Sequence, residues 1–172
     1  MAVLPIRIYP DPVLRAKCRE VRDFDAGLRK LAADMVETMH AAPGVGLAAP
    51  QIGVDLRIAV IDLSVGEDPK QVHVIVNPEV VHREGSEVAE EGCLSLPGIS
   101  DKVDRPTLIR VNAVDLDNRP IGIEAEGWLA RAFCHEIDHL SGVLFTDYLR
   151  GLRKERARRA LKRLAEDQVV RS

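Results

Sequence analysis

The segment His135-Glu136-Ile137-Asp138-His139 has the residue types and spacing of a metal site that hydrolyses its substrate. Histidines four positions apart lie on one face of a helix, so both imidazoles can reach a single ion. Glu136 sits to the side, where its carboxylate can contact a metal-activated water without binding the metal, as in zinc hydrolases. The same five-residue pattern also arises by chance on amphipathic helices with exposed histidines, so the motif alone leaves both explanations open.

A catalytic site of this kind needs a third protein ligand and an open position. The metzincin pattern requires a third histidine six residues after the second; Gly142 fits that pattern, but Phe145 stands at the ligand position and excludes it. Other zincins use a downstream glutamate, and Glu155 lies among arginines, which makes it a poor candidate. Cys93 is better because a thiolate binds Fe²⁺ or Zn²⁺ strongly, although a lone cysteine is more often an inert buried residue.

The other cysteines do not suggest a further site. Cys134 adjoins His135 and therefore points about 100° around the helix from it, which predicts a place in the core. Cys18 has no motif around it. Three cysteines form no even set for a disulfide framework, and reduced thiols are typical of a cytosolic protein.

Three helices are expected from the hydrophobic spacing and the capping residues. They span residues 25–42, 127–140 and 152–166, and the second carries the histidine pair. Strand-like runs lie at 57–63 and 72–76, a charged strand or loop at 87–91, and a hairpin at 107–115 and 121–125. Because helices and strands do not alternate regularly, this order predicts an α+β fold with antiparallel pairing.

Length and composition narrow the class of protein. The chain has 172 residues, which fits one domain covering residues 1–172. A net charge of −3 argues against binding DNA through bulk charge. No apolar run is long enough to cross a bilayer, and the first residues lack a signal-peptide pattern. We therefore expect a cytoplasmic protein with no membrane partner.

Three separate segments of the chain form a recognisable pattern when they are considered together. They are Gly44-Val45-Gly46-Leu47-Ala48-Ala49-Pro50-Gln51, Glu91-Gly92-Cys93-Leu94-Ser95 and His135-Glu136-Ile137-Asp138-His139-Leu140. In this order and spacing they resemble the three signature motifs of the peptide deformylase family, and the likeness extends over nearly the whole chain. The family removes the formyl group from the N-terminal formyl-methionine of new bacterial proteins. The resemblance implies one catalytic domain, with antiparallel β-sheets packed around a central metal-binding helix, an N-terminal helix and a C-terminal basic helix at about 150–172.

The resemblance also implies the metal centre. Cys93, His135 and His139 are similar to the family's metal ligands, which hold one divalent ion per chain. That ion is Fe²⁺ in the cell, and Zn²⁺, Ni²⁺ or Co²⁺ can substitute for it. Many members have a glutamine immediately before the first metal histidine, whereas this chain has Cys134. Because that side chain is expected to face away from the metal, we expect altered packing and no loss of activity.

The same resemblance assigns the catalytic roles. Glu136 is implied to be the general acid and base that takes a proton from water and returns it to the leaving amine. Gln51 and the backbone N–H of Leu94 are implied to stabilise the oxyanion, and Gly46 to contact the formyl group through its backbone.

The formyl-Met peptide is expected to bind beside these groups. Glycines at positions 44 and 46 remove side chains there, so a peptide can approach and pair as an added strand. Taken alone, the Gly-x-Gly pattern equally fits a tight turn after the first helix. The expected substrate contacts are Gly44, Val45, Gly92, Arg131 and Ala132, with the last two beside the pocket for the methionine side chain. Asp138 cannot face the metal with both histidines, and an ion pair with Arg105 is expected for it.

The C-terminal segment is strongly basic. Residues 150–172 contain nine basic and three acidic residues, a charge of +6, which leaves −9 for the rest of the chain. A solvated surface helix is the ordinary explanation of such a run. The alternative is that the helix docks on ribosomal RNA or protein, where a deformylase meets nascent polypeptides.

Two other functions compete with deformylation. An HExxH metallopeptidase would use a downstream histidine or glutamate as its third ligand, whereas Cys93 favours a deformylase. A metal-storage or ribosome-binding module with a relict site would need neither Glu136 nor Gln51. The presence of both residues therefore favours an enzyme.

Overall fold

A computed structural model describes residues 1–171 of the chain. Its larger sheet is antiparallel and contains, in spatial order, β1 (Gly46–Ala48), β2 (Ile58–Ile61), β3 (His73–Glu84), β6 (Leu108–Val114) and β7 (Pro120–Glu126). A second, two-stranded antiparallel sheet pairs β4 (Glu87–Gly92) with β5 (Ser100–Arg105). The expected α+β fold with antiparallel sheets is confirmed.

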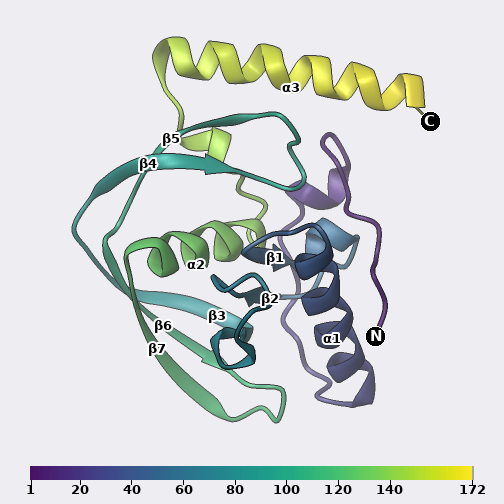
Figure 1. Cartoon of the computed structure of the whole chain (residues 1–172), viewed down its shortest axis with the longest axis vertical. Helices are drawn as coiled ribbons and strands as arrows, with labels where there is room; N and C mark the ends of the chain where they lie inside the picture. Colours follow the sequence, from purple (N-terminus) through teal and green to yellow (C-terminus); the bar gives the residue numbers. More distant parts are fainter. Residues whose placement is uncertain (172) are drawn as a thin grey trace.

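Helix α2 (Gly127–His139) lies between the two sheets, near the centre of the molecule (Figure 1). Its apolar side buries Phe133 and Ala130 in one cluster with Ile75 and Ile109 of the larger sheet. The helix ends where Gly142 takes a positive φ of 73° and lies so close to Arg15 that an added Cβ would be 2.5 Å from that residue's carbonyl oxygen. A glycine is therefore required at this turn. The expected central helix is confirmed.

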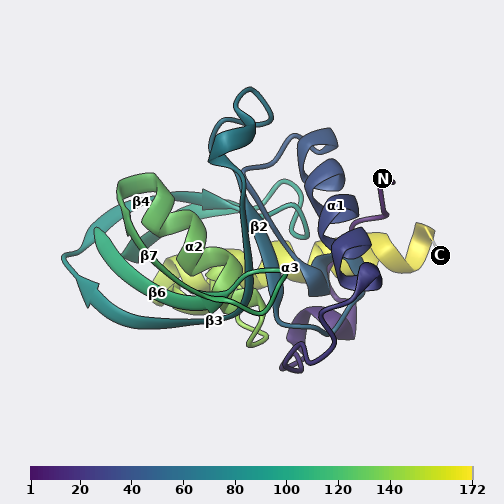
Figure 2. The ribbon, with the colours of Figure 1, turned by 90° about the horizontal axis from the view of Figure 1, so that it is seen from below.

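Helix α1 (Ala26–Ala41) begins at Asp25, whose side chain accepts a hydrogen bond from the backbone N–H of Leu28 at 3.0 Å. It covers the face of β2 opposite to α2 (Figure 2). Successive residues of a strand point to opposite faces. Ile58 and Val60 therefore pack in one apolar cluster with Met35 of α1 (the α1 cluster), whereas Ala59 and Ile61 pack in the cluster of Phe133 (the α2 cluster). This double burial explains why β2 is a continuous apolar run.

A third apolar cluster joins β5 to the C-terminal part of the chain. It contains Leu96, Val103, Phe145, Leu149 and Leu164. Helix α3 (Gly151–Arg171) packs there on only two buried side chains, while most of its surface is exposed (Figure 1). Within residues 1–171, none of the helices has the length and apolar character needed to cross a membrane.

The main differences from expectation lie in the strands and the last helix. Strand β3 continues past the expected end at residue 76 as far as Glu84. Charged residues and two register shifts interrupt the alternation of buried and exposed side chains in this extension, so the sequence pattern does not reveal it. Strand β5 was not expected, because Val103 and Arg105 are its only buried residues and the second is charged. Strand β1 lies inside the glycine-rich segment. Helix α3 is longer than 152–166, and Ser172 at the end of the expected 150–172 range lies outside the described residues.

Candidate metal centre

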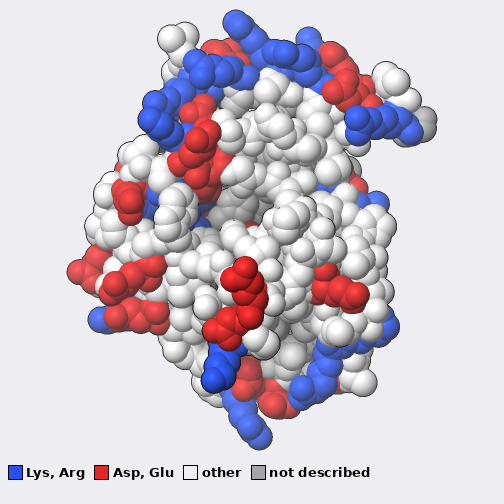
Figure 3. All heavy atoms as spheres, viewed as in Figure 1, with Lys and Arg blue, Asp and Glu red and all other residues white. Residues whose placement is uncertain are grey.

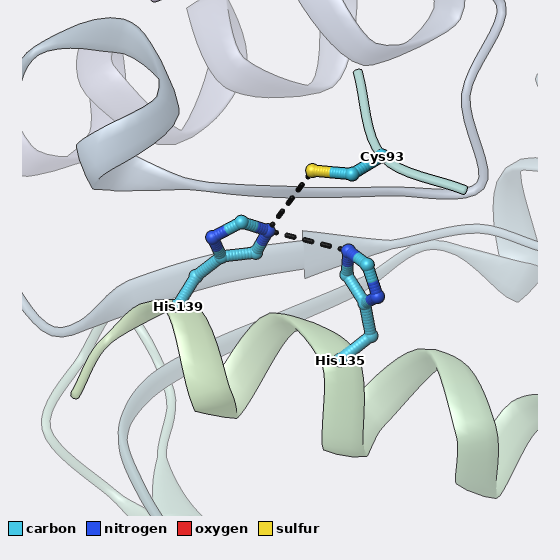
Figure 4. A group of neighbouring side chains, drawn as sticks. All are labelled: Cys93, His135 and His139. Atoms are coloured by element: carbon cyan, nitrogen blue, oxygen red, sulfur yellow. Dashed lines mark hydrogen bonds between the residues drawn. The ribbon is translucent and has the colours of Figure 1, made fainter. Parts of the chain in front are cut away.

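The side chains of Cys93, His135 and His139 point toward one another (Figure 4). Nε2 of His139 lies 3.4 Å from the Cys93 Sγ and 3.2 Å from Nε2 of His135. The three donor atoms lie within 4.8 Å of one another, and no other such group of histidine, cysteine and carboxylate side chains occurs among residues 1–171. Both histidines come from α2, one turn apart, while Cys93 follows β4 directly.

A buried carboxylate orients the first histidine. Glu91 Oε1 lies 2.9 Å from Nδ1 of His135. Burial opposes the charge on Glu91, but hydrogen bonds from Arg105 and His135 outweigh it and lower the pKa of Glu91 to about 2. Because an ionised carboxylate only accepts hydrogen bonds, Nδ1 carries the proton and donates it. Burial opposes a charge on His135, but hydrogen bonds to Cys93 and Glu91 outweigh it and raise the pKa of this imidazole well above its usual value. When a metal displaces the proton of Nε2, the lone pair there faces the other two donors, which is the usual arrangement of a metal-bound histidine.

The donor set fits a divalent transition metal. Burial lowers the pKa of His139, which keeps its imidazole in the neutral form that binds metals. One thiolate and two imidazoles suit Zn²⁺ or Fe²⁺, and a set of three protein ligands leaves a fourth position for water or substrate.

Glu136 is 5% exposed and lies next to this group on α2. Burial raises the pKa of its carboxyl to about 7, although a divalent cation on the neighbouring ligands would act in the opposite direction. Within residues 1–171 its Oε2 has no hydrogen-bond partner. An added Cβ on Gly46 would lie 2.5 Å from Glu136 Oε1 and 2.8 Å from its Cδ. The absence of a side chain at position 46 therefore makes the room that this carboxylate occupies.

The amide of Gln51 is held at both ends. It lies in a short 3₁₀ helix, Ala49–Ile52, and its Oε1 accepts a hydrogen bond from the N–H of Ala48 at 2.9 Å. Its Nε2 donates to Ser95 Oγ at 3.2 Å and lies 3.7 Å from Cys93 Sγ. These contacts direct the NH₂ group toward the cysteine.

A cavity of about 660 Å³ opens beside these groups, and a hollow is visible near the middle of the face in Figure 3. Every residue expected to act in catalysis or substrate binding lines it, and so do two of the three expected ligands. They are Gly44, Val45, Gly46, Gln51, Gly92, Cys93, Leu94, Arg131, Ala132, His135 and Glu136. The third ligand, His139, is 1% exposed and is not part of the lining.

Three further residues that the sequence singled out lie near the metal centre. Arg105 Nη1 donates to Asp138 Oδ2 at 2.6 Å, so the expected ion pair is confirmed. Cys134 is 4% exposed and packs in the α2 cluster, as expected for a core residue. Phe145, which stands where a metzincin has its third histidine, stacks on the ring of His135 at 6.2 Å.

Two supporting residues were missed although both lie in a motif that the sequence singles out. Glu91 orients His135, and Ser95, which is fully buried, accepts the hydrogen bond from Gln51. The signal for Glu91 was available, because a metal-bound histidine usually donates its other N–H to a carboxylate or carbonyl. An acidic residue two positions before the expected cysteine ligand was a candidate for that partner.

Known proteins resemble this chain over most of its length. The family model described as Polypeptide deformylase matches residues 3–155. A peptide deformylase of Alkalilimnicola ehrlichii is 49% identical over 164 residues, covering 95% of this chain and 92% of the relative. One from Brucella suis is 45% identical over 170 residues, covering 98% and 97%. The crystal structure of a peptide deformylase from Legionella pneumophila superimposes with a TM-score of 0.89 at 46% identity, covering 98% of each chain.

Proposed function

This chain belongs to the polypeptide deformylase family, and from that premise we propose which of its residues carry out the reaction. The enzyme removes the formyl group from the N-terminal formyl-methionine of newly synthesised proteins and releases formate. The family match does not favour the alternative function, an HExxH metallopeptidase. The observation that best supports the residue assignments is the convergence of Cys93, His135 and the amide of Gln51 at one cavity, with the third proposed ligand, His139, close to the first two.

We propose Cys93, His135 and His139 as the ligands of one divalent metal, with Fe²⁺ as the ion used in the cell. The family is one of metalloenzymes, and these three side chains present a thiolate and two imidazoles at mutual distances that suit one ion. When bound, such an ion supplies Lewis-acid chemistry and brings the pKa of a water molecule down to about 7.

Glu136 moves the proton in this proposal. Its carboxylate takes a proton from the attacking water and later delivers it to the nitrogen of the leaving amine, so that formate and a free N-terminus result. Its placement at the cavity wall, next to the proposed ligands, supports both halves of this role.

Gln51 and the backbone N–H of Leu94 are proposed to stabilise the negative oxygen that forms on the formyl carbon. The NH₂ group of Gln51 already faces Cys93, and Leu94 follows that cysteine at the cavity wall. One such donor contributes about 3 kcal/mol to a transition state of this type. The backbone at Gly46 is proposed to contact the formyl group.

The substrate chain is proposed to pair with β1. That strand is at the edge of the larger sheet, and its first residue, Gly46, lines the cavity together with the residues just before it. An extended peptide can add to such an edge through main-chain hydrogen bonds. Ala132 and Trp128, both on the cavity wall, are then available to the methionine side chain.

Helix α3 is proposed to bring the enzyme to the ribosome in the cytoplasm. Its basic side chains form a belt along one side of the molecule (Figure 3). Substituting the exposed Arg156, Arg159 and Arg163 by glutamine leaves the two buried contacts of the helix intact. Cosedimentation with ribosomes at low and moderate salt should fall in this variant. Equal cosedimentation of parent and variant would end the proposal.

The deformylase assignment is tested by its products. The protein is purified without oxygen, its bound metal is measured, and it is given formyl-Met-Ala-Ser. We expect formate and Met-Ala-Ser in equal amounts. Cleavage of the Met–Ala bond instead would point to a metallopeptidase, and no formate from metal-loaded, folded protein would refute the assignment.

A further inference from the structure

Arg131 is a charged residue on the cavity wall whose charge does not face the cavity. The residue belongs to α2, one turn before His135, and is 6% exposed. Its guanidinium lies against the two-stranded sheet, where Nη1 donates to Glu91 Oε2 at 2.7 Å and to the carbonyl of Val103 at 2.9 Å. Nη2 donates to the carbonyl of Glu87 at 2.6 Å.

These hydrogen bonds exclude the simplest role for an arginine in a substrate cavity. Both terminal nitrogens are already engaged by oxygen atoms of the protein. The guanidinium carbon also lies 5.7 Å from the centre of the ring of Trp128, an exposed residue. A substrate carboxylate would have to displace buried hydrogen bonds that include a charge pair, which is costly. Arg131 therefore lines the cavity without a free guanidinium to offer.

The bonds of Arg131 join the two elements that supply the metal ligands. Its acceptors Glu87 and Glu91 both belong to β4, and β4 leads directly into Cys93. Arg131 itself lies on the helix that carries both histidines. One side chain thus connects the strand before the thiol to the helix with the imidazoles.

The guanidinium suits this task better than another cation would. Its planar fork can donate to several oxygens in fixed directions, whereas a lysine ammonium acts as a single point charge on a flexible stem. Glu91 would keep Arg105 and His135 as donors if Arg131 were lost. The carbonyls of Glu87 and Val103 would lose the hydrogen bonds that Arg131 now gives them.

We propose that Arg131 is a positioning residue that fixes the thiol of Cys93 relative to the two histidines and so slows the release of the metal. This inference rests on the proposed ligand set. The role of Glu91 is different, because Glu91 orients the ring of His135. Arg131 instead holds β4, the strand that leads into Cys93, against helix α2. A change at position 131 should therefore alter the thiolate–metal bond as well as the rate of metal loss.

The test uses Co²⁺ as the probe, because a cobalt–thiolate bond gives an absorption band in the near ultraviolet. The variants are Arg131→Met, Arg131→Lys and the matched control Arg110→Met. Arg110 is 58% exposed and pairs with Glu124 on β7, away from the cavity. Three quantities are measured for each: the thiolate band, the rate of Co²⁺ transfer to an excess of chelator, and thermal unfolding of the metal-free protein.

We expect Arg131→Met to release Co²⁺ about tenfold faster or more, the range that supporting residues of metal sites usually show. Its thiolate band should shift or weaken, Arg131→Lys should fall between it and the parent, and Arg110→Met should match the parent. If Arg131→Met does not fold, Arg131→Lys decides by the same readouts.

Two outcomes would overturn the inference, and they are distinguishable. A parent protein without a thiolate band would remove the ligand set and the inference together. A parent with the band, and position 131 variants that release Co²⁺ at the parental rate with an unchanged band, would remove the inference alone. A lower unfolding temperature with those two readouts unchanged would show that Arg131 only stabilises the fold.

Discussion

The two walls of the cavity are built in opposite ways. The helix wall, which consists of residues 90–94 and 128–136, is held by buried charges: Glu91 accepts hydrogen bonds from Arg105, Arg131 and His135. The glycine wall, residues 43–51, contains no charged side chain, and its close approaches depend on the absence of side chains at Gly44 and Gly46. One wall positions reactive groups, and the other leaves room for them and for a peptide.

This difference predicts that substitutions in the two walls fail in different ways. Damage to the buried charges that support the helix wall should change how firmly the metal is held, whereas a change at Glu136, the proposed proton carrier on that wall, should affect turnover alone. Damage to the glycine wall should change turnover while the metal remains bound.

Gly46→Ala should be the more harmful of the two glycine substitutions in the glycine wall. The new Cβ would stand 2.5 Å from the Glu136 carboxylate and displace it. A misplacement of about 1 Å at a catalytic group costs roughly 100-fold in rate, so kcat should fall by about that factor. Metal content, measured by atomic absorption, should equal that of the parent. Loss of the metal along with activity would break the separation between the walls.

Glu91→Gln should act on the metal and is the counterpart in the helix wall. The substitution keeps the size of the side chain but removes the charge that orients His135 and pairs with Arg105. Loss of such a supporting carboxylate lowers metal affinity by about 10- to 100-fold. Competition with a chromophoric chelator measures this affinity. An unchanged affinity would show that Glu91 is not needed to orient the ligand.

Gly44→Ala tests whether a second glycine of the same wall is as sensitive to an added side chain as Gly46. Its new Cβ would meet the Cδ1 of Leu94 at 2.9 Å, and this atom is the flexible end of a side chain that can turn aside. We expect kcat/KM to fall by no more than about threefold, equivalent to roughly 0.6 kcal/mol. A loss as large as that of Gly46→Ala would show that any added side chain in this segment impairs catalysis, whether its neighbour is the Glu136 carboxylate or the end of Leu94.

The last prediction concerns stability and not activity, at Asp62, a fully buried residue whose N–H donates to the carbonyl of Val45 behind the glycine wall. Burial opposes its charge, but hydrogen bonds from Ser64, Gly66 and His40 outweigh it and lower the pKa from 3.8 to about 2. Since the folded-state pKa is the lower one, the carboxylate stabilises the fold above about pH 4, and this contribution is lost as the pH falls toward 2.

Asp62→Asn should therefore be less stable than the parent by roughly 2 kcal/mol at neutral pH. The difference should shrink as the pH falls from 4 toward 2, and urea unfolding of both proteins across that range measures it. A difference that stays constant with pH would show that the ionisation of Asp62 does not stabilise the fold.

Much of the fold was accessible from local sequence patterns. Helix α1 is defined by its cap at Asp25 and its apolar spacing, and β2 by an unbroken apolar run. Strand β5 has no such pattern, because its buried Arg105 is stabilised by Glu91 and Asp138, which are distant in sequence. Local patterns do not report that kind of partnership.

The same limit applies to the candidate site. The spacing of His135 and His139 predicts that they share a helix face, and the three motifs together indicate which residues meet. The orientation of each group could not be predicted, because it depends on contacts across the fold. Arg131 is the clearest case, since its sequence position predicts a cavity-lining residue and only the structure shows where its guanidinium is bound.

The most direct test of the account is the Glu136→Gln variant, studied with its metal in place. The substitution preserves the shape of the side chain and removes its ability to take a proton. We expect one metal per chain, as in the parent, and a loss of formate release of about 1,000-fold or more. A metal-loaded variant that releases formate at the parental rate would contradict the account.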